Sequence, residues 1–97
     1  MKKSVGLFFM FFGILAKAQS LFEVNGTVFS EGKPLAFSNV YIENSATGAI
    51  TNEEGVFKLT DLKPGTYTLI VSFTGYATSK KRIKITNKNV QIKFNLV

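Results

Sequence analysis

The chain has 97 residues, with 12 basic side chains against 6 acidic ones, and it contains neither histidine nor cysteine. A chain of this length suits one domain and leaves no room for a second. Without histidine and cysteine there are no disulfides, thiolate metal sites, cysteine nucleophiles or serine–histidine triads, and this points away from catalysis.

The first 18 residues have the three parts of a secretory signal peptide. Two lysines form the positive segment, residues 5–16 form an apolar run, and Ala16-Lys17-Ala18 supplies the small residues of a cleavage site. An apolar helix of twelve residues covers about 18 Å, well short of the ~30 Å hydrocarbon core, so a membrane anchor is disfavoured. We predict cleavage before Gln19 and an exported mature chain, residues 19–97, without a transmembrane span.

Removal of the leader also lowers the charge of the protein. Three of the lysines leave with it, so nine basic side chains remain against six acidic ones, a net charge of +3. A charge of this size keeps a domain soluble and implies no nucleic-acid partner by itself.

The mature chain consists of short β-rich segments separated by turns. Alternating apolar and polar residues predict strands at residues 22–29, 39–43, 49–51, 56–59, 66–73, 78–86 and 90–97. Turns rich in Gly, Pro, Asn and Ser separate them, and no segment after the leader has a helical period. The prediction is an all-β fold, a small antiparallel β-sandwich of about seven strands.

The rest of the chain is arranged around residues 49–59, which are predicted to form a strand, a tight turn and a second strand. Asn52-Glu53-Glu54-Gly55 is polar and ends on glycine, which suits a turn with a positive φ at Gly55. Beyond it, Phe57 and Leu59 share one face of the second strand.

Two further glycines predict local geometry. Gly26, in the middle of the first strand, indicates a bulge or a close backbone approach. Pro64-Gly65 suits a type II turn, with Gly65 at a positive φ.

Several motifs follow one another in a recognisable order. They are Val24-x-Gly26-x-Val28, Gly32-x-Pro34-Leu35, Asn39-Val40-x-Ile42, Thr47-Gly48-Ala49-x-Thr51-Asn52-x-x-Gly55-x-Phe57-x-Leu59, Pro64-Gly65-x-Tyr67-x-Leu69 and Gly75-Tyr76. Together they resemble the carboxypeptidase regulatory-like domain, a small transthyretin-like (prealbumin-like) β-sandwich, over roughly residues 22–96. A common family aspartate is Asn52 here, and asparagine tolerates the same turn conformations.

The resemblance implies a non-catalytic module with a protein partner and no cofactor. In Gram-negative bacteria such domains often form the N-terminal extension of TonB-dependent outer-membrane receptors, directly after a signal peptide. They also accompany peptidases and surface proteins. No plug domain or barrel follows Val97 in this sequence, so a free-standing module and the first piece of a longer receptor gene product both stay open.

The predicted function is therefore a periplasmic accessory or docking module, associated with an outer-membrane receptor system. The expected location is the periplasm or the outer membrane. The final strand, residues 90–97, is the expected connection point, and β-augmentation is the simplest mode of contact. The alternative is a free-standing exported module that binds a ligand such as a glycan on one sheet face.

Two charged segments are weighed as binding sites. Asn52, Glu53 and Glu54 offer oxygens to calcium but lack the spacing of an EF-hand loop, so a solvated turn is favoured. Lys80-Lys81-Arg82 with Lys84 offers a surface for anionic lipid or an acidic partner. A lysine-protected edge strand is favoured there, because nucleic-acid binding would require interleaved exposed aromatic residues.

Hydroxyl and aromatic side chains are weighed in the same way. Ser38, Ser72 and Ser79 have no histidine to activate them, and no nucleophile motif surrounds them. Tyr41, Tyr67 and Tyr76 with Phe37 offer stacking surfaces for a sugar, but packing in the core is favoured. No catalytic, metal-binding or cofactor-binding residue is assigned.

Overall fold

The computed structural model describes residues 20–97, so the predicted signal peptide lies outside the described residues. The described part forms eight strands and no helix, which confirms the all-β prediction. The strands are β1 (Phe22–Ser30), β2 (Lys33–Pro34), β3 (Asn39–Ile42), β4 (Gly48–Ile50), β5 (Val56–Leu62), β6 (Gly65–Ser72), β7 (Ser79–Ile85) and β8 (Val90–Asn95).

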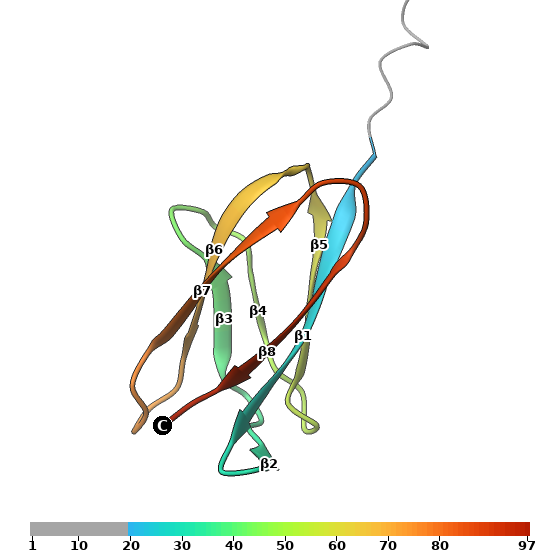
Figure 1. The fold of residues 1–97 in the computed structure, drawn as a ribbon. Coiled ribbons are helices and arrows are strands. Elements are labelled where there is room, and N and C mark those ends of the chain that lie inside the picture. The colour runs from blue at the N-terminus through green and yellow to red at the C-terminus, as the bar shows by residue number, and fades with distance from the viewer. Residues whose placement is uncertain (1–19) are drawn as a thin grey trace, which may run out of the picture.

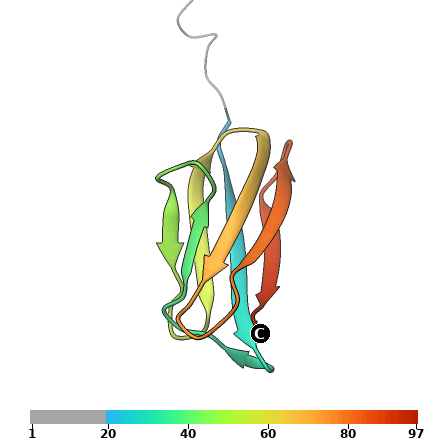
Figure 2. The same ribbon diagram turned by 90° about the vertical axis from the view of Figure 1, so that its left-hand side faces the viewer.

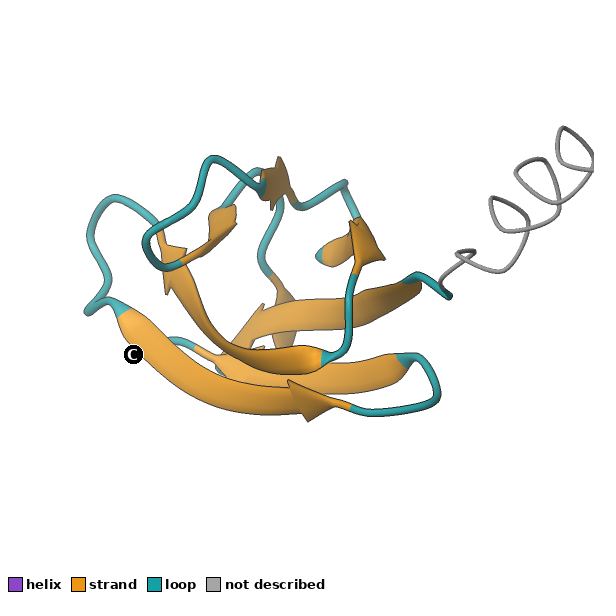
Figure 3. Cartoon of the chain, turned by 90° about the horizontal axis from the view of Figure 1, so that it is seen from above, coloured by secondary structure: helices purple, strands orange, loops and turns teal. Residues whose placement is uncertain are grey.

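The strands form two sheets that pack face to face (Figures 1 and 2). In the first sheet, β1 pairs with β2 and β5 along one side and with β8 along the other. The second sheet has the order β4-β3-β6-β7. Seen from above, the two layers enclose a single core (Figure 3). The predicted β-sandwich is therefore confirmed.

One ladder has an orientation that the sequence did not predict. All pairings are antiparallel except β1 with β8, which is parallel from Val24 opposite Val90 to Phe29 opposite Asn95. The chain reaches β8 by crossing from the second sheet to the first after β7. Because β8 is entered by a crossover and not by a hairpin from β1, antiparallel pairing is not imposed on it.

The segment at residues 49–59 also crosses between sheets. Its turn is formed as predicted, but β4 lies in the second sheet and β5 lies in the first. The two strands therefore do not form a hairpin ladder, and the interpretation of the segment as a hairpin is wrong. The sandwich needs such crossings, because each sheet must bury one face against the other.

The core is built from the apolar residues of alternating strand positions. The fully buried side chains include Val24 and Val28 of β1, Leu59 of β5, Leu69 of β6 and Phe94 of β8. Val56 and Lys58, which alternate with the buried residues of β5, are exposed. The predicted inward faces of these strands are therefore confirmed, and they follow from the two-residue period of a strand.

Three of the predicted glycine effects can be compared with the structure. The group close to Gly26 is a side chain and not a backbone: a Cβ atom there would lie 2.3 Å from Cζ of Phe57, so this glycine admits the Phe57 ring against the β1 backbone. The register shift of β1 lies between Phe22 and Val24, so Gly26 marks no bulge. Gly55 has the predicted positive φ, at 75°. The predicted type II turn at Gly65 is wrong: Gly65 begins β6 with a φ of 158°, and Asp61 near the end of β5 takes the positive φ of 60°.

Candidate functional site

The buried hydroxyl groups of the described residues hold together the crossing between the sheets. Thr51 Oγ1 accepts a hydrogen bond from the Ser38 amide at 2.9 Å and donates to the Leu35 carbonyl oxygen at 2.7 Å. The Ser38 hydroxyl lies 3.1 Å from Thr51 Oγ1, and the side chains of Ser38 and Thr51 are almost fully buried. Ser38, weighed as a nucleophile, is therefore a structural residue that water and substrates do not reach.

Ser72 and Ser79, the other two serines weighed as nucleophiles, do not meet. Ser72 pairs with Asn39 on the outer face of the second sheet, the face that points away from the first sheet. Ser79 pairs with Val71, whose side chain faces the core. Because paired residues share a face, the two serines point to opposite sides of the sheet.

The Asn52–Gly55 turn uses its amide side chain for its own backbone. Asn52 Oδ1 accepts hydrogen bonds from the amides of Glu54 and Val56, each at 2.9 Å. Gly55 donates to the Asn52 carbonyl at 2.9 Å, which closes the turn. Asn52 therefore forms an Asx turn, which agrees with the favoured interpretation of this segment as a solvated turn. Among residues 20–97, no group of three or more acidic side chains is placed to hold a metal ion.

The aromatic residues weighed as a sugar platform do not form one surface. Tyr67 packs against the core and donates from its hydroxyl to the Lys63 carbonyl at 2.6 Å, which ties the β5–β6 connection. Tyr76 also packs against the core and contacts the ring of Phe73, with the ring centroids 5.9 Å apart. Tyr41 and Phe37 remain exposed. Core packing is thus confirmed for Tyr67 and Tyr76, and not for Tyr41 and Phe37.

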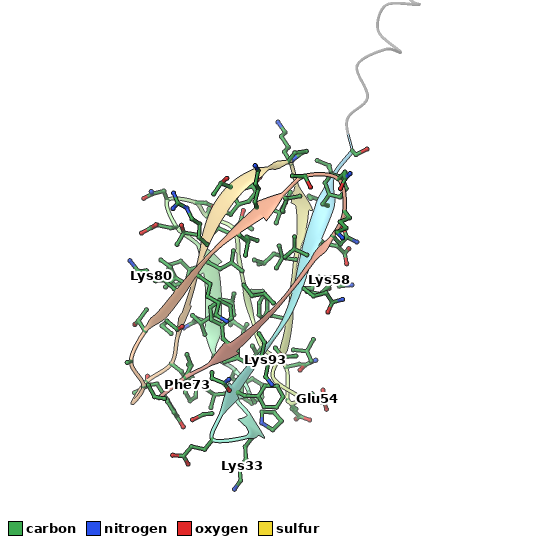
Figure 4. All side chains as sticks on the ribbon, in the orientation of Figure 1. Lys33, Glu54, Lys58, Phe73, Lys80 and Lys93 are labelled. Atoms are coloured by element: carbon green, nitrogen blue, oxygen red, sulfur yellow. The ribbon has the colours of Figure 1, made fainter. Side chains whose placement is uncertain are left out.

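The basic run lies on β7, which is one of the two edge strands of the second sheet, as predicted. Its residues divide between two faces. Lys80, Arg82 and Lys84 pair with outward-facing residues of β6, and we call these three the outer basic row. Lys80 also forms an ion pair with Glu43 at 3.5 Å. Lys80 and Lys58 lie on opposite sides of the domain (Figure 4).

Lys81 is separated from the outer basic row by the strand geometry. It pairs with the core residue Leu69, so it leaves β7 on the inner face. Its amine lies 5.2 Å from the centre of the Phe94 ring and donates to the Lys93 carbonyl of β8. Lys81 therefore closes the gap between the edges of the two sheets, and the four basic residues do not form one binding patch.

Two open hollows lie on the outer faces of the sheets. The β1–β8 hollow, on the first sheet, is lined by Asn25, Thr27, Val56, Gln91 and Lys93. The β3–β4 hollow, on the second sheet, is lined by Asn39, Tyr41, Gly48, Ile50 and Ser72. The first contains the polar side chains of Asn25, Thr27, Gln91 and Lys93 beside Val56, whereas the second presents the exposed side chains of Tyr41 and Ile50.

The backbone at Phe37 is strained, which the sequence did not predict. Phe37 is 62% exposed and has a φ of +62°, a conformation that bulky side chains seldom adopt. Its amide donates to the Thr51 carbonyl at 2.9 Å, which holds the strained backbone in place. No local pattern predicts this conformation, because the residue that holds Phe37 lies on another segment of the chain.

The described residues contain no helix that is long and apolar enough to span a membrane. Within the same residues, every buried side-chain nitrogen or oxygen has a hydrogen-bond partner. The polar groups of the described core are thus engaged in the fold, and the surfaces open to a partner are the sheet edges and the two outer faces.

The chain was compared with known proteins. The model of the CarboxypepD_reg-like domain matches residues 24–97. A comparison with curated proteins finds no match. Similar solved structures include a chain of the type II cohesin–X-dockerin complex of Acetivibrio cellulolyticus with a C-terminal interface mutant (TM-score 0.68, 18% identity, 77% of this chain and 56% of that chain covered). The N-terminal interface mutant of the same complex is also similar (TM-score 0.66, 20% identity, with the same coverage of 77% and 56%).

This likeness concerns the fold. At 18% and 20% identity, the two chains support the β-sandwich architecture and nothing finer. The present chain spans little more than half the length of either of them.

Proposed function

This chain belongs to the CarboxypepD_reg-like domain family, and we propose that it is a non-catalytic docking module of the bacterial cell envelope. Its partner is a protein of the outer membrane, in the receptor system that the sequence resemblance implies. The module acts by contact and not by chemistry.

The observation that supports this proposal is the distribution of polar groups. The hydroxyl and amide groups of the motif residues, Thr51, Asn52 and Tyr67, form hydrogen bonds inside the domain. The motif therefore maintains the fold, and it leaves no polar cluster at which a substrate would react. What the domain offers to other molecules is backbone at the sheet edges and side chains on the outer faces, and these suit recognition of a protein.

Export is part of the same proposal. Residues 1–18 act as the signal peptide, residues 19–97 form the mature domain, and the mature chain acts in the periplasm or at the outer membrane. The support is the charge, length and small-residue pattern of the leader. The intact mass of the exported protein tests this step: a mature chain that still carries the first three residues would contradict it.

Crosslinking in membrane fractions tests the docking function. The full chain is expressed in its own host with a C-terminal tag, crosslinked in living cells and recovered from outer-membrane fractions. We expect an adduct with an outer-membrane protein that mass spectrometry identifies. If the chain is recovered only as a free soluble monomer, the docking function is wrong.

A second candidate function is a glycan-binding module, and the β1–β8 hollow favours it. Asn25, Thr27 and Gln91 place polar side chains side by side on the outer face of the first sheet. The Lys93 amine lies over one face of the nearby Phe29 ring, 4.9 Å from its centre, so that face is not open for a sugar to stack on. Calorimetric titration with cell-envelope oligosaccharides, repeated with Gln91→Ala, separates this function from docking.

A further inference from the structure

The strand β4 offers unpaired backbone groups along one side. It is an edge strand and pairs only with β3 among the described strands. Ile42 donates to the Thr47 carbonyl and Thr51 donates to the Ser38 carbonyl, each at 3.0 Å, so residues 47 and 51 face β3. In an antiparallel ladder the bonding direction alternates along the strand. The N–H and C=O groups of Gly48 and Ile50 therefore point away from β3, toward the open side.

Two exposed apolar side chains lie on the outer face of β3 and β4, and a third exposed apolar residue lies in the segment next to them. Ile50 pairs with Asn39, Tyr41 pairs with Gly48, and both apolar side chains lie on the outer face of the second sheet. Ile50 and Phe37 are each 62% exposed, and Tyr41 is 40% exposed. Phe37 lies in the segment that enters β3, opposite the end of β4. We call β4 together with Phe37, Tyr41 and Ile50 the β4 surface.

The backbone at Phe37 supports a role for this surface. A positive φ strains the backbone of a phenylalanine, and such strain persists only where the surroundings impose it. Here Thr51 imposes it through the hydrogen bond to the Phe37 amide. The result is an aromatic ring held out in water, where burial in the core does not offset the cost. A ring held in this way is suited to anchor a partner.

The charges near the β4 surface indicate the chemistry of that partner. Between Pro34 and Val56 the chain carries three glutamates and no lysine or arginine. Glu43 forms the ion pair with Lys80, and the other two, Glu53 and Glu54, lie in the turn that follows β4. Lys33 lies at the same end of the domain as Glu54 (Figure 4), but on β2 of the first sheet. The basic residues of the second sheet are concentrated on β7, at its other edge. Complementary charge on the partner is therefore positive.

We propose that the β4 surface binds an extended segment of a partner protein, which adds to the second sheet as a further strand. The segment carries apolar side chains at alternate positions, which meet Phe37, Tyr41 and Ile50, and lysine or arginine at its ends. The proposal rests on the docking function and names the surface and the partner segment for it. Short edge strands can bind in this way, because the backbone supplies affinity and alternate side chains supply specificity.

A second copy of the chain is a poorer occupant than such a segment. In a second copy, the other free edge of the second sheet is β7, and its outward side chains are the outer basic row. Those charged side chains would lie beside Ile50 and Tyr41, where an apolar partner is required. Two β4 strands that paired with each other would bring the glutamates of both copies together, which is unfavourable.

Two synthetic peptides test the proposal with the full chain. Both have the same alternating isoleucine–threonine centre, and they end in either lysine or glutamate. Binding is measured by fluorescence anisotropy on labelled peptide. We expect the lysine peptide to bind about tenfold more tightly than the glutamate peptide, because Glu53 and Glu54 attract lysine at the peptide ends and repel glutamate. Equal binding of the two peptides, or no binding at millimolar concentration, overturns the proposal.

Matched variants locate the binding. Ile50→Lys should weaken the lysine peptide about tenfold, because it removes a central apolar anchor and adds a repulsive charge. Thr60→Lys adds the same charge at an exposed β-branched residue of β5, on the other sheet, and it should leave binding unchanged. Equal weakening by both variants, or by neither, overturns the assignment to the β4 surface. Unchanged thermal unfolding confirms that each variant is folded.

The crosslinking experiment separates the two proposals. If wild type and Ile50→Lys crosslink equally to the outer-membrane partner, docking stands and the β4 surface is wrong. If neither chain crosslinks, the docking function itself is wrong. Sedimentation of the chain alone completes the test: self-association that Ile50→Lys abolishes would make a second copy the occupant and overturn the proposed partner segment.

Discussion

Replacement of Thr51 by valine should unfold the domain under conditions in which the wild type is stable. Valine has nearly the shape of threonine, so the packing changes little, but it cannot form hydrogen bonds. The change removes the acceptor of the Ser38 amide, at 2.9 Å, and the donor to the Leu35 carbonyl, at 2.7 Å. Because Ser38 is fully buried, water cannot replace the lost acceptor.

The structure allows the size of this effect to be worked out. A buried donor left without a partner costs about 1–3 kcal/mol. The Leu35 carbonyl belongs to a half-buried residue, so water compensates part of its loss. The sum is about 2–4 kcal/mol, against a total stability of roughly 5–10 kcal/mol for a domain of this size. At about 4–8 °C for each kcal/mol, the melting temperature should fall by roughly 10–30 °C.

Urea unfolding followed by circular dichroism measures this loss, and two controls accompany it. Thr51→Ser keeps the hydroxyl and should cost about 1 kcal/mol, the value of a buried methyl group. Thr60→Val makes the same chemical change at an exposed position of β5 and should stay within about 0.5 kcal/mol of wild type. If Thr51→Val also stays within that range, the hydrogen bonds of Thr51 do not hold the crossing between the sheets.

Two further predictions concern the turns and the edge of the sandwich. Gly55→Ala should cost about 2–4 kcal/mol, because its Cβ would lie 2.6 Å from the Val28 carbonyl oxygen in addition to the strain of a positive φ. Gly32→Ala has the same kind of φ but nothing within 4 Å, so a chemical-denaturation ΔΔG as large as that of Gly55→Ala would contradict the steric argument. Serine at all three positions of the outer basic row should leave the fold intact and promote self-association, because charged side chains keep edge strands from pairing. Light scattering that stays monomeric at high concentration would count against this protective role, and loss of binding to anionic vesicles would favour a lipid surface.

The local features of the fold could be predicted because they depend on neighbouring residues. The inward face of β6 follows from the alternation of Tyr67, Leu69 and Val71, which pack in the core as expected. Gly55 has its positive φ because the turn needs it. In each case a stretch of a few residues contains the whole physical cause.

The pairing of strands could not be predicted, because alternation identifies a buried face and not the neighbouring strand. The sequence of residues 49–59 therefore looks like a hairpin, although its strands lie in different sheets. The parallel alignment of β8 with β1 has the same origin, since it joins segments at opposite ends of the domain's sequence.

The candidate sites show the same limit. Lys80-Lys81-Arg82 looks like one charged block in the sequence, but the strand period places Lys81 on the inner face of β7. That division was available from the sequence once the strand was recognised. The strained backbone of Phe37 was not, because it depends on a hydrogen bond to Thr51 across the crossing between the sheets.

The two long sides of the sandwich differ in how their edges are closed, and this difference decides where a partner binds. On one side, Lys81 spans from β7 to β8, and the outer basic row protects β7. On the other side, β4 is a strand of three residues without any charge. An uncharged edge invites pairing with other chains, and its short length limits that pairing to segments that also match the side chains around it. This combination of open backbone and selective side chains is what a docking strand requires. We therefore propose β4 as the contact with the partner, in place of the final strand that the sequence suggested.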